Sequence, residues 1–353
     1  MRDSDPDIAR LRILMTADAV GGVWQYSLDL IQHLVSLGAE LRLATMGPRP
    51  TDAQTQRLSR LRGVSLVESE YKLEWMQQPW DDVDAAGAWL LQQAAEFRPD
   101  VIHLNGYAHV PLKWLAPVLV VAHSCVYSWW NAVHGCAPPL HAWAEYHARV
   151  SAGLRAADAI VAPSSFMAGE LTTRYGLPKS RTRVIHNFSE SPEYDRRPKE
   201  PLFLAAGRTW DQGKNVQLLE SIADRLPWPI QIAGNLTHDA VLDTMHRASV
   251  YVHSALYEPF GLAVLEAARS GCCLVLADIP SLRELWSDTA LFVDPRDPAA
   301  WVDVLSMVAN DRERRETLAK LAHQRATQYS AAVTVAEYCQ IYRSLYARKS
   351  AAA

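Results

Sequence analysis

Two glutamates in the segment YEPFGLAVLE, residues 257–266, have the spacing of ligand-binding groups at the start of a helix. Pro259 and Gly261 mark a turn, and a helix is expected to begin near Gly261, where free backbone N–H groups attract phosphate. Glu266 would lie about one turn into this helix, and its two acceptor oxygens suit a vicinal diol such as a ribose. Glu258, in the turn, would reach the hydroxyls of a sugar. A surface loop followed by a solvated helix would show the same spacing.

Two cations, Arg208 and Lys214, occupy the segment AAGRTWDQGKN, between an expected strand and the next helix. A diphosphate leaving group gathers negative charge in the transition state. Fixed guanidinium and ammonium groups at a strand end stabilise that charge without a metal. The pair is therefore a candidate phosphate site, with two exposed surface cations as the alternative.

Gly21, Gly22 and His123 are candidate ligand contacts in the first half of the chain. The glycines follow the run LRILMTAD and precede a helix, a position that lets a ligand approach the backbone, although plain turns also use paired glycines. No G-x-G-x-x-G fingerprint is present there, which counts against a nicotinamide or flavin enzyme. His123 ends the apolar run PVLVVAHS, where a parallel sheet faces a ligand, but a core histidine is the alternative.

Aromatic residues follow His123 in the segment SCVYSWWNAVHG. Tyr127, Trp129 and Trp130 are candidates for a wall that stacks on a sugar or another planar acceptor. Packing of the domain core is the alternative. If the wall exists, Trp129→Ala should raise the KM of the acceptor and leave donor binding unchanged.

Composition and charge argue against several other functions. The 353 residues carry a formal net charge of −4, so no basic excess points to nucleic-acid binding. The charged N-terminus does not resemble a secretory signal, no apolar run has the length of a membrane span, and the five cysteines contain no C-x-x-C pair. We therefore expect a cytoplasmic protein. Arg57, Arg60 and Arg62 form too small a basic face for more than peripheral membrane contact, and a solvated face is the alternative.

Candidate metal ligands are poorly placed in the sequence. The D-x-D patterns within residues 3–7 and 82–84 do not end a strand, and His134, His141 and His147 lack compact ligand spacing. We therefore expect no metal site and no resident cofactor.

The elements that must position these residues form two similar halves. Near-continuous apolar runs alternate with amphipathic stretches, which predicts parallel sheets covered by helices on both faces. The predicted strands span residues 11–18, 39–46, 64–69, 100–105, 117–124 and 159–164, and then 201–207, 229–234, 249–254, 272–278 and 290–294. The predicted helices include residues 23–38, 81–97, 214–225, 238–247, 261–270 and 297–308, and a last one over 331–348 with a packing stripe of Tyr338, Tyr342 and Tyr346.

The fold predicted from this pattern is α/β, with two Rossmann-like, doubly wound domains that face each other. The polar, proline-bearing segment 189–201 has the composition of a linker between them. In such folds ligands lie at the carboxyl ends of the strands.

Taken together, these motifs resemble the family-4 retaining glycosyltransferases of the GT-B fold (glycosyltransferase group 1), over nearly the whole chain. GGVWQYSLDLIQHLVSLGAELRLAT is similar to the family's glycine-rich opening, RPDVIHLNG to its fourth strand and AAGRTWDQGKN to its GR…K signature. SALYEPFGLAVLEAARSGCCLVLADIPSLRELW is similar to its E-x7-E block. The resemblance implies an acceptor-binding domain over residues 1–190, a nucleotide-sugar-binding domain over 191–330, and a C-terminal helix, 331–353, that packs back on the N-terminal domain.

The resemblance also implies roles for single residues. Arg208 and Lys214 would hold the donor diphosphate, Glu258 the donor sugar and Glu266 the ribose, while His123 would approach the transferred sugar. The implied catalytic set is His123, Glu258, Arg208 and Lys214. The implied donor-binding set is Gly21, Gly22, Arg208, Lys214, Glu258, Phe260, Gly261, Leu262 and Glu266. Tyr127, Trp129 and Trp130 stay as the acceptor candidates.

The reaction implied by the resemblance is metal-independent transfer of a hexose, with UDP-hexose favoured, to a sugar or another hydroxyl acceptor. It retains the anomeric configuration through same-face attack. Two other functions stay open, a sugar-nucleotide 2-epimerase of the same fold and a non-catalytic nucleotide-sugar binding protein. Asn215, His253 and Arg269 stand where relatives more often have glycine, proline and a small residue, and VIHNFS lacks the usual Asn-Gly. These departures leave the identity of the donor open.

Overall fold

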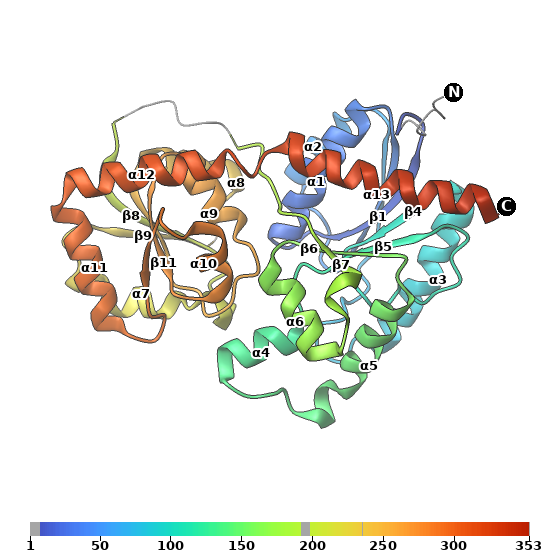
Figure 1. Cartoon of the computed structure of the whole chain (residues 1–353), viewed down its shortest axis with the longest axis horizontal. Coiled ribbons are helices and arrows are strands. Elements are labelled where there is room, and N and C mark those ends of the chain that lie inside the picture. Colours follow the sequence, from blue (N-terminus) through green and yellow to red (C-terminus); the bar gives the residue numbers. More distant parts are fainter. Residues whose placement is uncertain (1–7, 192–197, 235, 353) are drawn as a thin grey trace.

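The computed structural model describes residues 8–191, 198–234 and 236–352. Its first half is built on a parallel sheet of seven strands in the order β3-β2-β1-β4-β5-β6-β7 (Figure 1). The strands are β1 (Arg12–Asp18), β2 (Glu40–Met46), β3 (Val64–Glu68), β4 (Val101–Leu104), β5 (Val118–Val121), β6 (Ala159–Ala162) and β7 (Thr182–Val184). Since β4 and β5 are apolar runs buried along their whole length, helices must cover the sheet.

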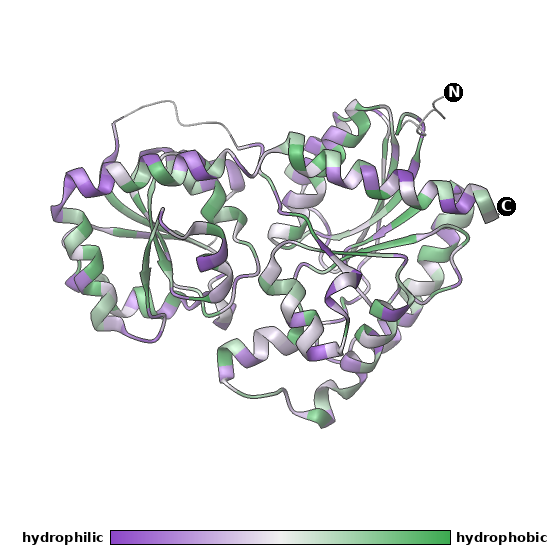
Figure 2. Cartoon of the chain, in the orientation of Figure 1, coloured by the Kyte–Doolittle hydropathy of each residue, from purple (hydrophilic) through white to green (hydrophobic). Residues whose placement is uncertain are grey.

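Helices surround this sheet as the apolar periodicity requires. They are α1 (Gly22–Ser36), α2 (Asp52–Ser59), α3 (Trp80–Phe97), α4 (Val126–His134), α5 (Leu140–Ala156) and α6 (Ser165–Tyr175), with the short 3-10 turn η1 (Lys179–Arg181). Most of these helices alternate hydrophobic and hydrophilic residues along their length (Figure 2). That alternation is expected where one helix face packs on a sheet.

The second half is built on a parallel sheet of five strands in the order β12-β11-β10-β8-β9. The strands are β8 (Glu200–Ala206), β9 (Ile230–Ala233), β10 (Ala248–His253), β11 (Cys273–Ala277) and β12 (Leu291–Val293). The helices are α7 (Val216–Ile222), α8 (His238–Arg247), α9 (Leu262–Arg269), α10 (Pro280–Trp286), α11 (Pro298–Asn310) and α12 (Arg312–Ala326), with the 3-10 turns η2 (Gln212–Lys214) and η3 (Ala223–Arg225).

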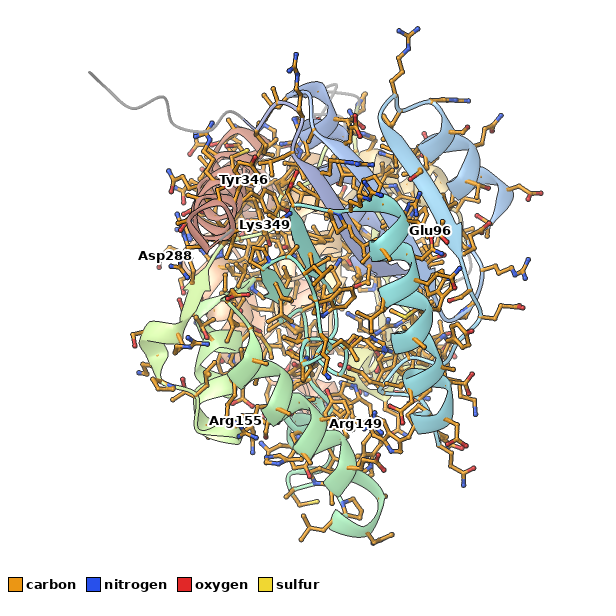
Figure 3. The ribbon with its side chains drawn as sticks, turned by 90° about the vertical axis from the view of Figure 1, so that its right-hand side faces the viewer. Glu96, Arg149, Arg155, Asp288, Tyr346 and Lys349 are labelled. Carbon is orange, nitrogen blue, oxygen red and sulfur yellow. The ribbon has the colours of Figure 1, made fainter. Side chains whose placement is uncertain are left out.

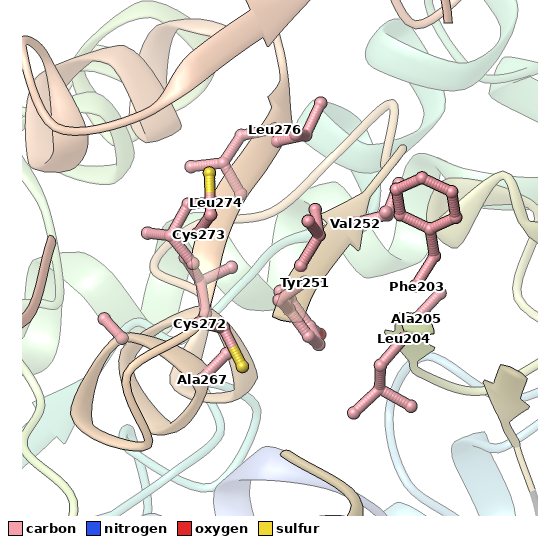
Figure 4. Close-up of a cluster of buried hydrophobic side chains, with 14 of the residues drawn as sticks. Phe203, Leu204, Ala205, Tyr251, Val252, Ala267, Cys272, Cys273, Leu274 and Leu276 are labelled. Atoms are coloured by element: carbon pink, nitrogen blue, oxygen red, sulfur yellow. The ribbon is translucent and has the colours of Figure 1, made fainter. Parts of the chain in front are cut away.

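The core of the second half gathers around its central strands. Figure 4 shows side chains of β8, β10 and β11, among them Phe203, Tyr251 and Leu274, in one buried cluster. Cys272 and Cys273 are buried in the same cluster as free thiols. These cysteines therefore act as small core side chains.

The last helix, α13 (Ala331–Ala352), leaves the second half and lies along the first (Figure 1). Tyr338 and Tyr342 are fully buried in the core that α1 and β1 form, which confirms the predicted packing stripe and the predicted return of this helix. Lys349 Nζ donates to Pro99 O and pairs with Asp100 Oδ1, both at 3.1 Å, so the far end of α13 is tied to the entry of β4. Figure 3 shows Lys349 and Tyr346 on this helix.

The predicted strands all form, each within a few residues of its expected ends. The pattern missed β7, which is only three residues long, and it did not define α4, α5, α6, α10 or α12. The expected helix over 214–225 is interrupted, because Asn215 has φ of +52° and separates η2 from α7. Within the described residues, no helix combines the length and the apolar character that crossing a membrane requires.

Candidate functional site

Glu258 lies at the centre of a buried charged cluster in the second half. Its Oε2 accepts from Lys214 Nζ at 2.6 Å and from His253 Nε2 at 3.1 Å. Burial by itself would raise the pKa of the Glu258 carboxyl, but the charge of Lys214 and the hydrogen bond from His253 outweigh it and hold the pKa well below its usual range. Glu258 is therefore a carboxylate at any physiological pH, and it fixes Lys214 in one orientation.

The loop after Glu258 leads into a helix at the predicted position. Gly261 has φ of +89°, in the left-handed region, and a Cβ there would lie 3.1 Å from Val264 Cγ2 and 3.3 Å from Glu258 Cγ. Helix α9 begins at Leu262, and its N-cap, Gly261, makes no side-chain capping bond. Phe260 is buried against His186 and Tyr329. Because the first backbone N–H groups of α9 have no side-chain cap, they are suited to an anion.

Arg208 lies at the junction of the two halves. Its Nη2 donates to Asp211 Oδ2 at 2.7 Å, and its guanidinium stacks over the Trp210 ring at 5.0 Å. Its Nε is buried with no hydrogen-bond partner. A buried N–H without a partner is costly, so this atom is suited to an acceptor such as a phosphate oxygen. The stem of Lys214 packs on Gly207, 3.5 Å from where a Cβ would stand, so both cations lie at the end of β8.

The glycine pair of the first half touches the second half at this junction. Gly21 has φ of +79°, and a Cβ there would lie 3.2 Å from Arg208 Nη1. A Cβ on Gly22 would lie 3.6 Å from Leu262 Cδ1. The structure therefore brings Gly21, Gly22, Arg208 and Leu262 together across the domain boundary, with close approach that a side chain at residue 21 would block.

Glu266 is buried at the base of α9, with 4% of its surface exposed. Its Oε1 accepts from His238 Nε2 at 2.8 Å and from Ser189 Oγ at 3.4 Å. Burial opposes the charged form of His238, but the Glu266 carboxylate outweighs this effect and raises the pKa of the imidazole. Both of these bonds end on Oε1, so the carboxylate keeps capacity to accept from a diol through Oε2.

His123 is held by polar neighbours beneath the end of β5. Its Nε2 lies 2.9 Å from Asn105 Oδ1, and its ring packs edge-on against Tyr26 at 4.5 Å. Asn105 Oδ1 also lies 3.3 Å from Nε2 of the buried His103. Burial lowers the pKa of His123 to about 3, so its imidazole is neutral at physiological pH and cannot act as a cation toward phosphate.

Two family models together match nearly all of the chain. Residues 20–189 match Glycosyltransferase Family 4, and residues 174–325 match Glycosyl transferases group 1. The chain belongs to this glycosyltransferase family. It is 25% identical to the glycogen synthase of Mycobacterium tuberculosis over 90% of each chain.

The fold of this glycosyltransferase is shared with solved structures. Sucrose-phosphate synthase from Thermosynechococcus elongatus matches with a TM-score of 0.80 at 17% identity, over 96% of this chain and 100% of that one. HepE from Anabaena, solved in complex with UDP-glucose, matches with a TM-score of 0.73 at 15% identity, over 95% of this chain and 100% of that one. These matches confirm the predicted GT-B fold of two Rossmann-like domains.

The aromatic residues predicted to face an acceptor have different sets of neighbours in the glycosyltransferase. Tyr127 is buried and its ring packs against those of Tyr146 and Tyr175, which is a core position. Trp130 packs on His134 at 4.5 Å and edge-on against Trp129, with the ring centroids 6.3 Å apart. Trp129 crosses to the second half, where its Nε1 donates to Asp211 Oδ1 at 3.0 Å. Trp129 and Trp130 are therefore in contact with each other, whereas Tyr127 lies in the core, and the acceptor role of the three residues stays a prediction.

The predicted basic face and one of the two D-x-D patterns lie within the residues that the structure describes. Arg57 lies 3.6 Å from the buried Asp29, so this arginine is not part of a free basic face. Asp82 falls in the first turn of α3, and Asp84 pairs with Arg149. The D-x-D pattern within residues 3–7 lies outside the described residues. In the part of the chain that the structure describes, no three His, Cys, Asp or Glu side chains group as metal ligands.

Several residues of the site were missed at the level of sequence. They are Asp18, Asn105, Asp211, His238 and His253. His253 appeared only as a departure from the family, yet it contacts Glu258. Asp18 ends β1 beside Arg208, and burial raises the pKa of its carboxyl to about 6. A position directly after or at the end of a strand is the signal that three of them share, namely Asp18, Asn105 and His253.

A cavity of about 310 Å³ lies next to Glu258, between the two halves. The first half lines it with α4 and α6, through Asn131, Phe166 and Glu170 among others. The second half lines it with the segments 256–258 and 279–281. Space bordered by both domains is therefore available beside the central carboxylate.

Proposed function

We propose that this glycosyltransferase transfers a hexose from a nucleoside-diphosphate sugar to a hydroxyl acceptor, with UDP-hexose as the favoured donor. The observation that carries the proposal is that Lys214 pairs with Glu258 just before the uncapped start of α9, while Arg208 lies at the same strand end as Lys214 and beside Gly21. Two cations after β8 and free backbone N–H groups after its neighbour β10 suit a diphosphate, and a carboxylate beside Lys214 suits sugar hydroxyls.

The choice of UDP-hexose is supported by the fold neighbour HepE, whose structure contains UDP-glucose. In this chain, Glu266 would accept from the ribose hydroxyls, and Arg208 would give its unpartnered Nε to a phosphate oxygen. The acceptor is a hydroxyl compound, for which the cavity beside Glu258 offers the polar side chains of Asn131 and Glu170.

The proposed mechanism needs positive charge at the leaving diphosphate, and Arg208 and Lys214 would supply it without a metal ion. The anomeric configuration would be retained by attack on the face from which the diphosphate leaves, with the leaving phosphate assisting deprotonation of the acceptor. The neutral His123 would donate or accept a hydrogen bond with the transferred sugar rather than carry charge.

The donor is tested by calorimetric titration of the protein with UDP-, GDP-, ADP- and dTDP-glucose. We expect binding of UDP-glucose, and loss of at least about tenfold in affinity in Arg208→Ala, because a charge-assisted contact to phosphate is removed. Arg312→Ala is the matched control, since Arg312 pairs with Glu316 on the exposed face of α12. Equal binding by all three proteins would contradict the phosphate role of Arg208.

The reaction class is tested by incubating the protein with the bound donor in the presence and absence of candidate hydroxyl acceptors, after treatment with a chelator. We expect product only with an acceptor, full activity after chelation, and an unchanged anomeric configuration by NMR. Conversion of the donor to its 2-epimer without acceptor would identify an epimerase. Binding without any turnover would identify a nucleotide-sugar binding protein.

A further inference from the structure

Helix α4 belongs to the first half, yet it is fastened to the second half at three points along its length. Near its start, Ser128 Oγ lies 2.8 Å from Tyr257 Oη. In the next position, Trp129 Nε1 donates to Asp211 Oδ1 at 3.0 Å. At its end, Arg296 Nη2 donates to Ala132 O at 2.9 Å, where helix carbonyls favour a cation. Helix α4 is therefore bonded to the second domain along its length, although it belongs to the first.

The central contact leads directly to the phosphate-binding arginine. Asp211 Oδ1 accepts from Trp129 and from Gly213 N at 2.9 Å, and Oδ2 accepts from Arg208 Nη2 at 2.7 Å. Burial by itself would raise the pKa of Asp211, but Arg208 outweighs this and lowers it, so the carboxylate stays charged. Both oxygens of one carboxylate are thus used, one toward the first domain and one toward Arg208.

The approach of Trp129 is built into the loop that carries the cations. A Cβ at Gly213 would lie 2.5 Å from Trp129 Nε1, closer than any side chain allows. The absence of a side chain at residue 213 is therefore what lets the indole reach Asp211. Lys214 follows immediately, so the indole docks on the turn that presents Lys214 to Glu258.

We propose that Trp129 is a positioning residue for the donor diphosphate, which acts from the opposite domain through Asp211 on Arg208. The indole N–H holds the Asp211 carboxylate in one rotamer, and this carboxylate aims the guanidinium at the phosphate. Without the indole, Asp211 and Arg208 regain rotamer freedom that must be lost again when the donor binds. A residue of the first domain thus completes the phosphate site of the second. This changes the expectation for Trp129, because its removal should weaken donor binding rather than acceptor binding alone.

The proposal rests on the proposed nucleotide-sugar donor, and it is tested by titrating the full chain with UDP and with UMP. The difference in affinity between UDP and UMP measures the contribution of the second phosphate, which Arg208 would hold, because both compounds carry the same base and ribose. Trp129→Phe removes the N–H and keeps an aromatic ring. We expect UDP affinity to fall about tenfold, as for the loss of one hydrogen bond to a charged group, with UMP affinity unchanged. Trp143→Phe is the control, since Trp143 packs against Tyr146 within the first domain.

Asp211→Asn is the second variant, and it tests the positioning role even if Trp129→Phe folds poorly. The amide oxygen can still accept from Trp129 and Gly213, but its NH₂ group cannot accept from Arg208. We expect the same loss of UDP affinity, and no further loss when both substitutions are combined, because the two residues act in series.

The outcomes separate the two proposals. If the wild-type protein prefers UDP to UMP and both variants keep that preference, the positioning role is overturned and the proposed function stands. If the variants lose UDP and UMP affinity equally, the role is structural and the positioning proposal is overturned as well. If the wild-type protein shows no preference for the diphosphate of uridine, guanosine or adenosine over the monophosphate, the proposed function fails and the inference falls with it.

Discussion

Replacement of Lys214 by methionine separates the two roles that the structure gives to this lysine. Lys214 and Glu258 form a pair at 2.6 Å, with 19% and 12% of their side chains exposed. Lys214→Met keeps the length of the side chain and leaves the Glu258 carboxylate buried, with only His253 as a partner. Removing one member of a buried ion pair typically costs about 3–5 kcal/mol of stability.

The expected thermal effect follows from this magnitude. For a domain of this size, 1 kcal/mol shifts Tm by roughly 2–4 °C, so the variant should melt about 10 °C lower. Without Lys214, burial dominates and the pKa of Glu258 should rise. In the wild-type protein that pKa lies below its unfolded value, so the contribution of Glu258 to stability is present above about pH 4.3 and is lost only as the solution becomes strongly acidic. In the variant this contribution should be absent at neutral pH.

A double variant then distinguishes stability from chemistry. Lys214→Met with Glu258→Leu replaces the pair by apolar groups, which is often neutral for stability. We expect its Tm to return to within a few degrees of the wild-type value, while turnover with the nucleotide-sugar donor stays reduced by about 10²-fold or more. Differential scanning fluorimetry and a coupled assay of nucleotide release measure the two quantities. A double variant that recovers turnover together with Tm would refute the assignment of Lys214 to the phosphate.

Three further predictions concern other parts of the site. Burial holds the pKa of His103 and of His123 at about 3, below the ordinary 6.5, so the unfolded chain binds more protons in acid than the folded chain does. The contribution of these histidines to stability should therefore be complete above about pH 6.5 and should fall as the pH decreases. Urea unfolding from pH 8 to 5 should show a smaller change of the unfolding free energy with pH in His123→Gln than in the wild-type protein. Glu266→Gln should reduce UDP affinity about tenfold and leave 2′-deoxy-UDP affinity nearly unchanged, which calorimetric titration checks, because the carboxylate is assigned to the ribose diol. Asn215→Gly keeps a residue suited to φ of +52° but removes amide bonds to the carbonyls of residues 254 and 295, so urea unfolding should show a loss of about 1–2 kcal/mol.

The elements of the fold follow from local sequence because the strands of a doubly wound sheet are buried on both faces. His123, two residues after β5, was singled out from sequence as a side chain at the sheet's carboxyl edge, whereas Asp18 at the end of β1 was not. β7 was not predicted, because three residues are too few to show a periodic pattern. The helix break at Asn215 was not predicted, because an asparagine with positive φ leaves no trace in the hydrophobic periodicity.

Four charged residues, Arg208, Lys214, Glu258 and Glu266, were singled out from sequence, whereas the groups that contact them, such as Asp211, His238 and His253, were not. Glu258 and Lys214 lie 44 residues apart along the chain, and both were singled out because each stands in a recognisable turn. His253 is five residues from Glu258, but it lies at the end of a buried strand, where a histidine is as often a core residue. Only the pairing of β8 with β10 brings His253 and Lys214 to the same carboxylate.

The position of Trp129 depends on the docking of two domains, which no local pattern encodes. An aromatic residue after a sheet end fits an acceptor wall, a core and a domain contact equally well, because all three bury the same apolar ring. The decisive atom is the indole N–H, since a buried donor must find an acceptor, and the acceptor here is 82 residues away on the other domain. Gly213 carries the complementary signal, because a side chain there would occupy the place of the indole. Gly213, beside the lysine proposed to bind phosphate, thus makes room for a side chain of the opposite domain, and the proposed donor site includes residues of both halves of the chain.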